Sequence, residues 1–354
     1  MMLTARNRLR PRAHGAPGPR AARAGRRTAA ALLLVALAVP PAAAVTWPMA
    51  RDKQVIGELT TDVLRPGDRL VDMARMHNIG FVEMRAANPG LDPWLPKAGE
   101  RITVPQLHVL PESAREGIVI NLAERRLYYF AAEWPDRDGA VVSTHPVGVG
   151  LAERATPLTR TRVTARVEDP AWYPTEPVRD WYRRVRDIEL PAVVPPGPEN
   201  PLGRHALILE GDGLLIHGTH RPAGVGMRVS QGCIRLYPES IANLIGQVPV
   251  GTPVRIVDQP ARLGWRRDRL YAEIDPPGDT PGDQHGERVW RQLLADASTR
   301  AEARGAALDR TALREAFRRA DGIPVVVAEA PGAQPRTSNR NENAGRVPGV
   351  DEIR

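Results

Sequence analysis

The stretch that decides the fold runs from His205 to Leu236 and reads HALILEGDGLLIHGTHRPAGVGMRVSQGCIRL. An apolar run ends at His217, and a second strand-like run follows Cys233, the only cysteine in the chain. Glycines in the loop between them let the backbone turn sharply. Two adjacent strand ends joined by such a loop can bring an imidazole within hydrogen-bond reach of a thiol. The stretch therefore predicts a β domain that carries a cysteine nucleophile and a histidine base.

Two other interpretations of this cysteine compete with the nucleophile. A structural zinc site could use His217, His220 and Cys233, but it needs a fourth ligand, and the loop over 218–232 contains no carboxylate. An inert buried thiol is the commoner state of a free cysteine. The nearby Arg235 argues against it, because a guanidinium lowers the pKa of a thiol. The sequence therefore favours a reactive Cys233 and assigns the base to His217, with His220 on the solvent side of the loop.

The charge of the chain is concentrated at its amino terminus. The 354 residues have a formal net charge of +8 and a pI near 10.3, values that occur in nucleic-acid-binding proteins. Residues 1–44, however, contain eight arginines and no lysine, aspartate or glutamate, which leaves 41 basic and 41 acidic residues in the rest. We therefore predict no nucleic-acid partner.

The same segment has the three parts of a signal peptide. An Arg-rich start precedes an apolar run over Thr28–Val39, and small residues precede an expected cleavage after Ala44. About a dozen apolar residues are few for a bilayer span, so a retained membrane anchor is the less favoured alternative. We expect residues 1–44 to be a signal peptide and the protein to be exported.

Residues 60–106 form a small predicted unit of strand, helix, helix and strand. Apolar positions at helical spacing follow Arg69, a second short helix fits Phe81–Ala87, and Arg101–Pro105 closes the unit as a strand. About 45 residues are near the lower limit for a domain that folds alone.

The rest of the chain divides into three predicted parts. Residues 116–258 are mostly β, and we expect one short helix over Pro238–Gln247. Within it, Asp169–Pro201 is rich in Pro, Trp and Tyr and is expected to be a long ordered loop. Residues 262–330 form an accessory, partly helical region, and 331–354 a disordered tail. In the accessory region we expect a strand pair over Leu263–Ile274 and helices over Glu287–Leu294 and Thr311–Ala320.

The small unit resembles a LysM module, a domain that binds glycans containing N-acetylglucosamine. The runs Pro66–Leu70, Arg85–Gly90 and Ile102–Pro105 carry this resemblance. Val63 and Leu64 stand where the family usually has an aromatic residue. Glycan binding is therefore one expectation, and a packing module that positions the next domain is the other.

A second resemblance covers the opening stretch. His217-Gly218-Thr219, Gly224–Gly226 and Ser230–Arg235 resemble the signature of L,D-transpeptidase catalytic domains of the YkuD type. The flanking runs Asn200–Gly203 and Pro249–Val254 resemble the exported Gram-negative enzymes of the ErfK, YbiS, YcfS and YnhG group, which carry LysM. This resemblance implies a periplasmic enzyme whose mostly β catalytic domain is a β-sandwich with a short helix.

The chemistry implied by this resemblance is acyl transfer on peptidoglycan. The Cys233 thiolate is expected to attack the carbonyl between diaminopimelate and D-Ala of a donor tetrapeptide, with His217 as proton acceptor and donor. The backbone carbonyl of Gly218 is expected to orient His217. The N–H groups of Gly232 and Cys233 are expected to form an oxyanion hole.

The remaining site residues are expected to serve the substrate. Arg235 would hold a carboxylate or set the charge of the site, Ser230 would fix the loop, and Thr219 belongs to the same substrate-binding group. Gln231 stands where the family often has histidine, which alters the charge near the thiolate. No metal and no cofactor are expected.

The expected partners are the stem peptides and glycan strands of peptidoglycan, with an outer-membrane lipoprotein as a further acceptor. The acyl group can pass to the terminal lysine of that lipoprotein or to a second stem peptide. A hydrolase acting at the same site, either an L,D-carboxypeptidase or an amidase that releases the lipoprotein, is an alternative. A non-catalytic peptidoglycan-binding protein is another.

Overall fold

The computed structural model of the chain describes residues 45–49, 52–131, 140–211, 213–277 and 283–332. The predicted signal peptide and nearly all of the predicted tail lie outside these residues. Within the described part of the chain, no helix is both long and apolar enough to cross a membrane.

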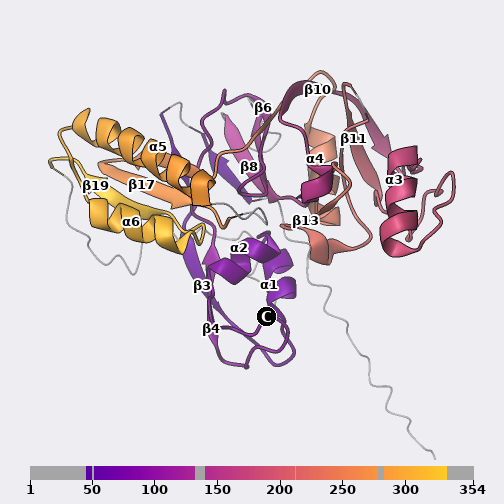
Figure 1. The fold of residues 1–354 in the computed structure, drawn as a ribbon, viewed down its shortest axis with the longest axis horizontal. Coiled ribbons are helices and arrows are strands. Elements are labelled where there is room, and N and C mark those ends of the chain that lie inside the picture. Colours follow the sequence, from indigo (N-terminus) through magenta and orange to yellow (C-terminus); the bar gives the residue numbers. More distant parts are fainter. Residues whose placement is uncertain (1–44, 50–51, 132–139, 212, 278–282, 333–354) are drawn as a thin grey trace, which may run out of the picture. The chain divides into compact units, whose positions relative to one another are not determined.

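Nine strands form one sheet in the order β1-β8-β7-β6-β15-β10-β11-β12-β14 (Figure 1). Their bounds are β1 Val45–Pro48, β6 Gly117–Asn121, β7 Arg126–Ala131, β8 Val141–Pro146, β10 Thr159–Glu168, β11 His205–Leu209, β12 Leu215–His217, β14 Ile234–Arg235 and β15 Pro253–Val257. Two further short strands, β9 Val149–Gly150 and β13 Arg228–Ser230, pair with each other in parallel. The domain is mostly β, as the sequence predicts.

The nine strands form one continuous sheet, whereas the resemblance implies a β-sandwich. The first half of β10 pairs with β15 and its second half pairs with β11, so the ten-residue strand belongs to both halves of the sheet. The register shifts between Val163 and Ala165. Such an irregularity bends a strand and increases its twist. The sheet therefore bends at β10 and remains one sheet.

The main hydrophobic core draws its side chains from both halves of this sheet and from α4, Pro238–Gln247. The helix has the bounds predicted from the sequence. Its buried residues Ile241, Leu244 and Ile245 follow helical spacing and form one apolar face. The β6 and β7 strands are buried on both faces, because a second cluster that includes Ile56 and Leu110 covers their other side.

The small unit has the predicted order of elements. It consists of β3 Leu59–Val63, α1 Leu70–Met76, α2 Phe81–Ala86 and β4 Arg101–Pro105, with β3 and β4 paired antiparallel. We call residues 59–105 the βααβ module. Its own core contains Leu70, Met84 and Ile102. The segments on either side pair with each other as β2 Val55–Ile56 and β5 His108–Val109.

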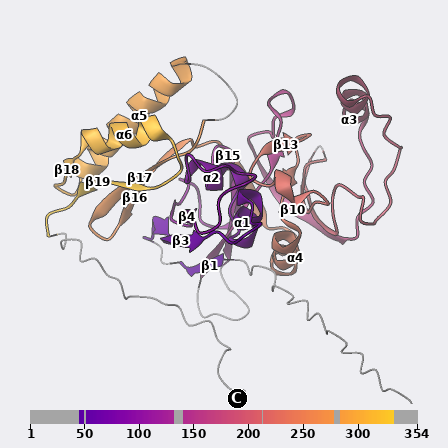
Figure 2. The same cartoon turned by 90° about the horizontal axis from the view of Figure 1, so that it is seen from below.

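The accessory region is a four-stranded antiparallel sheet, β16-β17-β19-β18, against which α5 and α6 pack (Figures 1 and 2). The bounds are β16 Ala261–Arg266, β17 Arg269–Ile274, α5 Asp283–Glu302, β18 Ala307–Leu308, α6 Arg310–Arg319 and β19 Val325–Glu329. The predicted strand pair and both predicted helices are present. The β18 and β19 strands were not predicted.

The predicted loop over 169–201 contains helical structure, which corrects that expectation. It holds α3 Glu176–Trp181 and a π-helical turn, η2 Tyr182–Arg186. Pro177 occupies the first turn of α3, where its missing N–H costs nothing. Asn200, fully buried, closes the segment by donating to the carbonyls of Pro170 and Val194.

Candidate active site

The predicted histidine and the motif arginine lie on adjacent strands. The β12 and β14 strands run parallel, with Ile216 opposite Ile234 and His217 opposite Arg235. Both isoleucines are fully buried in the core. Since side chains alternate along a strand, His217 and Arg235 lie on the other face. Cys233 directly precedes β14, and the charge of Arg235 acts on both its thiol and the imidazole of His217.

A backbone carbonyl fixes the imidazole of His217. Nδ1 lies 2.7 Å from the carbonyl oxygen of Gly218, the contact predicted from the sequence. This contact favours the tautomer with hydrogen on Nδ1, which leaves Nε2 to accept a proton. Burial and the neighbouring Arg235 lower the pKa of His217 to about 3. Hydrogen bonds with the backbone of Gly218 and Leu202 raise this pKa but do not outweigh the lowering. The imidazole is therefore neutral at physiological pH.

The half-buried Cys233 thiol points toward the start of β12. Its Sγ lies 3.9 Å from the carbonyl oxygen of Gly213, and in the described part of the chain no hydrogen bond joins it to His217. Burial raises the pKa of the Cys233 thiol. A hydrogen bond with the Leu215 backbone and the charge of Arg235 lower this pKa, but burial has the larger effect. The free site therefore holds a neutral thiol and a neutral imidazole.

A tight hydrogen-bonded turn holds Cys233 in place. The hydroxyl of Ser230 donates to the carbonyl of Cys233 at 2.5 Å and accepts from the N–H of Gly232 at 3.2 Å. Ser230 is buried, and these two hydrogen bonds fix the loop. The Gly232 N–H, predicted as an oxyanion donor, has a different partner here, because the turn places the Ser230 hydroxyl on it.

Thr156 supports the same turn and was not predicted. Its hydroxyl donates to the carbonyl of Gly232 at 2.8 Å and accepts from the N–H of Gly150 at 3.0 Å. No local pattern in the sequence marks this residue. Thr156 lies two residues after the short helix η1, Ala152–Arg154. The turn that follows β9 brings this segment back to the loop that carries Gly232.

Thr219, predicted to belong to the substrate-binding group, is buried as well. Its hydroxyl accepts from the N–H of Arg221 at 2.9 Å and so shapes the loop after β12. His220 is partly buried rather than on the solvent side, and its Nδ1 has no hydrogen-bond partner in the described residues. Burial, with Arg221 and Arg235, lowers the pKa of His220.

Arg235 is the member of the motif best placed for a substrate anion. Its backbone is held by two hydrogen bonds with Gly148, at 2.7 and 2.8 Å. Its Nε has no hydrogen-bond partner among the described residues. Burial lowers the pKa of Arg235, and the charge of Arg221 lowers it further, while Tyr182 acts in the opposite direction. An incoming carboxylate would relieve the repulsion between these two guanidiniums.

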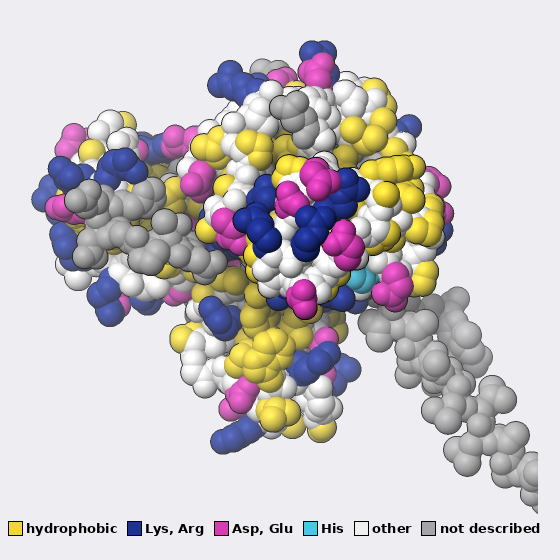
Figure 3. Space-filling model, turned by 45° about the vertical axis from the view of Figure 1, so that its right-hand side comes forward, with side chains coloured by type: hydrophobic (Ala, Val, Ile, Leu, Met, Phe, Trp, Pro, Cys, Tyr) yellow, Lys and Arg dark blue, Asp and Glu magenta, His cyan; other side chains and the backbone are white. Residues whose placement is uncertain are grey.

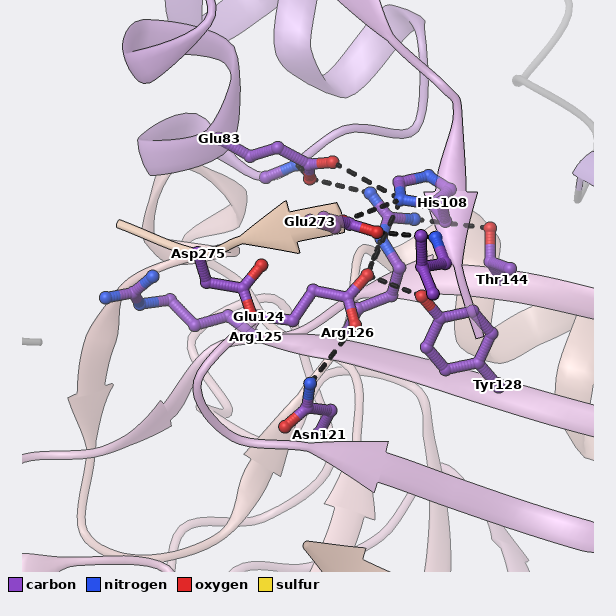
Figure 4. Close-up of polar contacts among 12 residues, drawn as sticks. Glu83, His108, Asn121, Glu124, Arg125, Arg126, Tyr128, Thr144, Glu273 and Asp275 are labelled. Carbon is purple, nitrogen blue, oxygen red and sulfur yellow. Dashed lines mark hydrogen bonds and ion pairs between the residues drawn. The ribbon is translucent and has the colours of Figure 1, made fainter. Parts of the chain in front are cut away.

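A separate group of potential metal ligands lies outside this site. His108, Glu124 and Glu273 are buried with their ligand atoms within 4.8 Å of one another (Figure 4). The Nδ1 of His108 is 3.5 Å from Glu124 and 3.8 Å from Glu273. The same carboxylates already have strong partners, because Arg262 lies 2.8 Å from Glu273 and the Tyr128 hydroxyl lies 2.5 Å from Glu124. We interpret the group as a buried ionic network.

The chain matches the model of the L,D-transpeptidase catalytic domain, YkuD, over residues 115–256. Probable L,D-transpeptidase YcfS of Escherichia coli K12 is 43% identical over 235 residues, covering 65% of this chain and 71% of that protein. Probable L,D-transpeptidase ErfK/SrfK of the same organism is 37% identical over 290 residues, covering 80% of this chain and 91% of that protein. This chain therefore belongs to the L,D-transpeptidase family and is a peptidoglycan L,D-transpeptidase.

Solved structures match only distantly. The catalytic domain of the Enterococcus faecium L,D-transpeptidase, solved by NMR, is 22% identical, with 41% of this chain and 99% of that chain covered and a TM-score of 0.31. The family assignment rests on the sequence relatives. It accounts for the mostly β fold and for an enzyme that acts on peptidoglycan peptides.

Proposed function

We propose that Cys233 is the nucleophile and His217 its general base in this transpeptidase. The Cys233 proton passes to Nε2 of His217 while Sγ attacks the carbonyl carbon between diaminopimelate and D-Ala. The imidazolium then gives this proton to the departing amine of D-Ala, and a thioester remains on Sγ. The observation that supports the proposal is the parallel pairing of β12 with β14, since β12 ends at His217 and β14 begins one residue after Cys233.

The second half of the reaction restores the thiol. An amine attacks the thioester carbonyl, His217 takes the proton released from the amine nitrogen, and the amide product leaves. The departing Cys233 sulfur then recovers its proton from the imidazolium. Water in place of the amine would make the same site a hydrolase, the alternative with identical residues.

Two groups support the charges that develop in these steps. The N–H of Cys233 would donate to the oxyanion, an interaction commonly worth about 3 kcal/mol per donor. Arg235 would bind a carboxylate of the stem peptide, since its guanidinium lies near the thiol and carries a free Nε. Gly218 keeps the imidazole in the orientation that presents Nε2.

The finer assignments follow from the sequence. Residues 1–44 would direct export, and the protein would act in the periplasm. The βααβ module would bind glycan strands as a LysM-like domain. It presents exposed hydrophobic side chains, Trp94 and Leu95 among them, and hydrophobic surface is visible on this unit in Figure 3. Acceptors would be a second stem peptide or the terminal lysine of an outer-membrane lipoprotein.

Mass spectrometry of the purified protein tests the central proposal. Incubation with a carbapenem should add one acyl group at Cys233, and the variant Cys233→Ala should stay unmodified. With a donor tetrapeptide and an amine, the wild type should release D-Ala and form a new amide. Release of D-Ala with only free tripeptide would favour the hydrolase. A wild type without any adduct or product would favour a protein that only binds peptidoglycan.

A further inference from the structure

The βααβ module is in direct backbone contact with the loop that precedes the nucleophile. The N–H of Phe81, at the start of α2, donates to the carbonyl of Val225 at 3.3 Å. A Cβ built on Gly80 would lie 2.9 Å from Cα of Gly226, closer than side chains tolerate. The two backbones can approach this closely only because both residues are glycine. The contact lies between His217 and Cys233 in sequence, on the loop that joins them.

Three hydrogen bonds tie the same part of the module to α4 and β8. The hydroxyl of Tyr237, which precedes α4, donates to the carbonyl of Ile79 at 3.0 Å. The hydroxyl of Ser240 donates to Oδ1 of Asn78 at 3.1 Å. The amide of Asn78 then donates to the carbonyl of Thr144 at 2.9 Å. Tyr237, Ser240 and Asn78 are all buried, so water does not replace these bonds.

A buried ion pair fixes the other side of Gly80. Glu83 of α2 lies 2.6 Å from Arg126 of β7, whose side chain is fully buried (Figure 4). The same carboxylate oxygen accepts from the N–H of Gly80 at 3.3 Å. The catalytic sheet thus holds Glu83, Glu83 holds Gly80, and Gly80 limits the position of Gly226.

We propose that the βααβ module is a positioning element of the active site, which holds the loop over 221–226 in the conformation that acylation of Cys233 requires. This inference rests on acylation of Cys233 as described above. It gives the module a role that does not depend on glycan binding. A module that served only as a glycan anchor would need no contact with this loop, and its disturbance would leave reactions with soluble donors unchanged.

The variant Gly80→Ala tests the contact with little change elsewhere. Gly80 has φ −73° and ψ 146°, which alanine adopts without strain, so the only consequence of the new methyl group is its clash with Gly226. Gly246→Ala is the matched control, because a Cβ there meets no atom within 4 Å. Ser240→Ala is a second variant, which removes the bond to Asn78 without any clash.

The measurements are the rate of Cys233 acylation by a soluble donor tetrapeptide without glycan, its kcat and KM, and the rate of Cys233 alkylation by iodoacetamide. For Gly80→Ala we expect acylation to fall by about tenfold to 10²-fold, since small displacements in an active site have effects of this size. Alkylation should stay within about twofold of the wild type, because the thiol and His217 are intact. Ser240→Ala should lower acylation in the same way, and Gly246→Ala should not.

Acylation at the wild-type rate in both interface variants would overturn the proposal. An equal fall of alkylation and acylation would also overturn it, since that result indicates general damage to the fold. If Gly80→Ala does not fold, the acylation and alkylation rates of Ser240→Ala alone test the proposal. Failure of the proposed chemistry is a separate result, because the wild type itself would then show no acylation at Cys233.

Discussion

His217 and Arg235 lie opposite each other on the adjacent parallel strands β12 and β14, and the guanidinium helps to keep the imidazole uncharged. A neutral imidazole can accept the thiol proton at once, whereas an imidazolium cannot. The same guanidinium favours the thiolate of Cys233, although burial still keeps its pKa above the ordinary value. One arginine therefore prepares the base and assists the nucleophile.

The first prediction concerns the pH dependence of acylation. The pKa of His217 is about 3, so this base stays neutral as pH falls well below 6.5. The acylation rate of the wild type by a carbapenem should therefore vary little between about pH 5 and 8. In Arg235→Gln the pKa of His217 rises, and the rate should begin to fall at a higher pH than in the wild type.

The measurement is the acylation rate as a function of pH, obtained by stopped flow. The pH at which the rate falls on the acid side, the acid limb of this profile, decides the prediction. The absolute rate of Arg235→Gln will also fall if the arginine binds substrate, but that effect does not move the limb. A wild-type limb centred near about pH 6.5, the ordinary imidazole value, would show that the site does not hold His217 neutral.

A second prediction concerns Thr156, which joins Gly150 to Gly232 through its hydroxyl. Thr156→Val keeps the shape of the side chain but leaves the buried Gly150 N–H and Gly232 carbonyl without this partner. We expect a loss of about 1–3 kcal/mol in the free energy of unfolding, measured with urea. Acylation of Cys233 should slow as well, because the turn that carries it loosens.

Thr156→Ser is the control for this experiment, since it retains the hydroxyl and removes only a methyl group. It should recover most of the stability and the acylation rate. If Thr156→Val behaves as the wild type does in both measurements, the hydroxyl bridge does not support the turn.

Local sequence patterns predicted the elements that build the catalytic domain. The helix predicted over Pro238–Gln247 has the bounds of α4. The α3 helix was missed because Pro174 and Pro177 surround its start, and proline is typical of loops. The β19 strand was missed because Val325–Glu329 has no alternation of buried and exposed positions.

Some residues of the candidate site could likewise be predicted from the sequence, and others could not. Cys233 and His217 lie in one stretch of the sequence, so the proposed nucleophile and base follow from residue types and spacing, and the role of Gly218 follows from the family resemblance. Thr156 and the contact of Gly80 with Gly226 depend on segments that only the fold brings together. The sequence also does not show that the Ser230 hydroxyl turns back onto the Gly232 N–H.

A third prediction concerns the effect of the buried His145 on the free energy of unfolding at acid pH. His145 is fully buried, and burial, with the charge of Arg126, lowers its pKa to about 3. In the unfolded chain its pKa is about 6.5, so between these values the unfolded state binds a proton that the folded state does not. The stability contributed by neutral His145 is therefore complete above about pH 6.5 and is lost as pH falls toward 3.

The measurement is the free energy of unfolding between pH 7 and pH 4 for the wild type and His145→Gln. Each such histidine adds a slope of about 1.4 kcal/mol per pH unit within its window, and the variant should lose one such contribution. The comparison uses slopes, because the variant also loses the contact of His145 with Ser143 and its stability differs at every pH. Equal slopes would mean that His145 is protonated in the folded protein.

The last prediction separates the two roles proposed for the βααβ module. Trp94 is 56% exposed, and its ring centroid lies 5.7 Å from that of Phe81, which holds the indole in place. A fixed, exposed aromatic face suits the apolar side of a sugar ring. Trp94→Ala should lower the affinity for insoluble peptidoglycan, measured by co-sedimentation, by roughly tenfold, or about 1.4 kcal/mol.

Leu95→Ala is the matched control, since Leu95 is the neighbouring apolar residue and is 82% exposed. It should bind almost as the wild type does if stacking on the indole is what matters. Acylation by a soluble donor should be unchanged in both variants, in contrast to Gly80→Ala, because neither side chain contacts the loop over 221–226. Unchanged co-sedimentation of Trp94→Ala would leave the module with the positioning role alone.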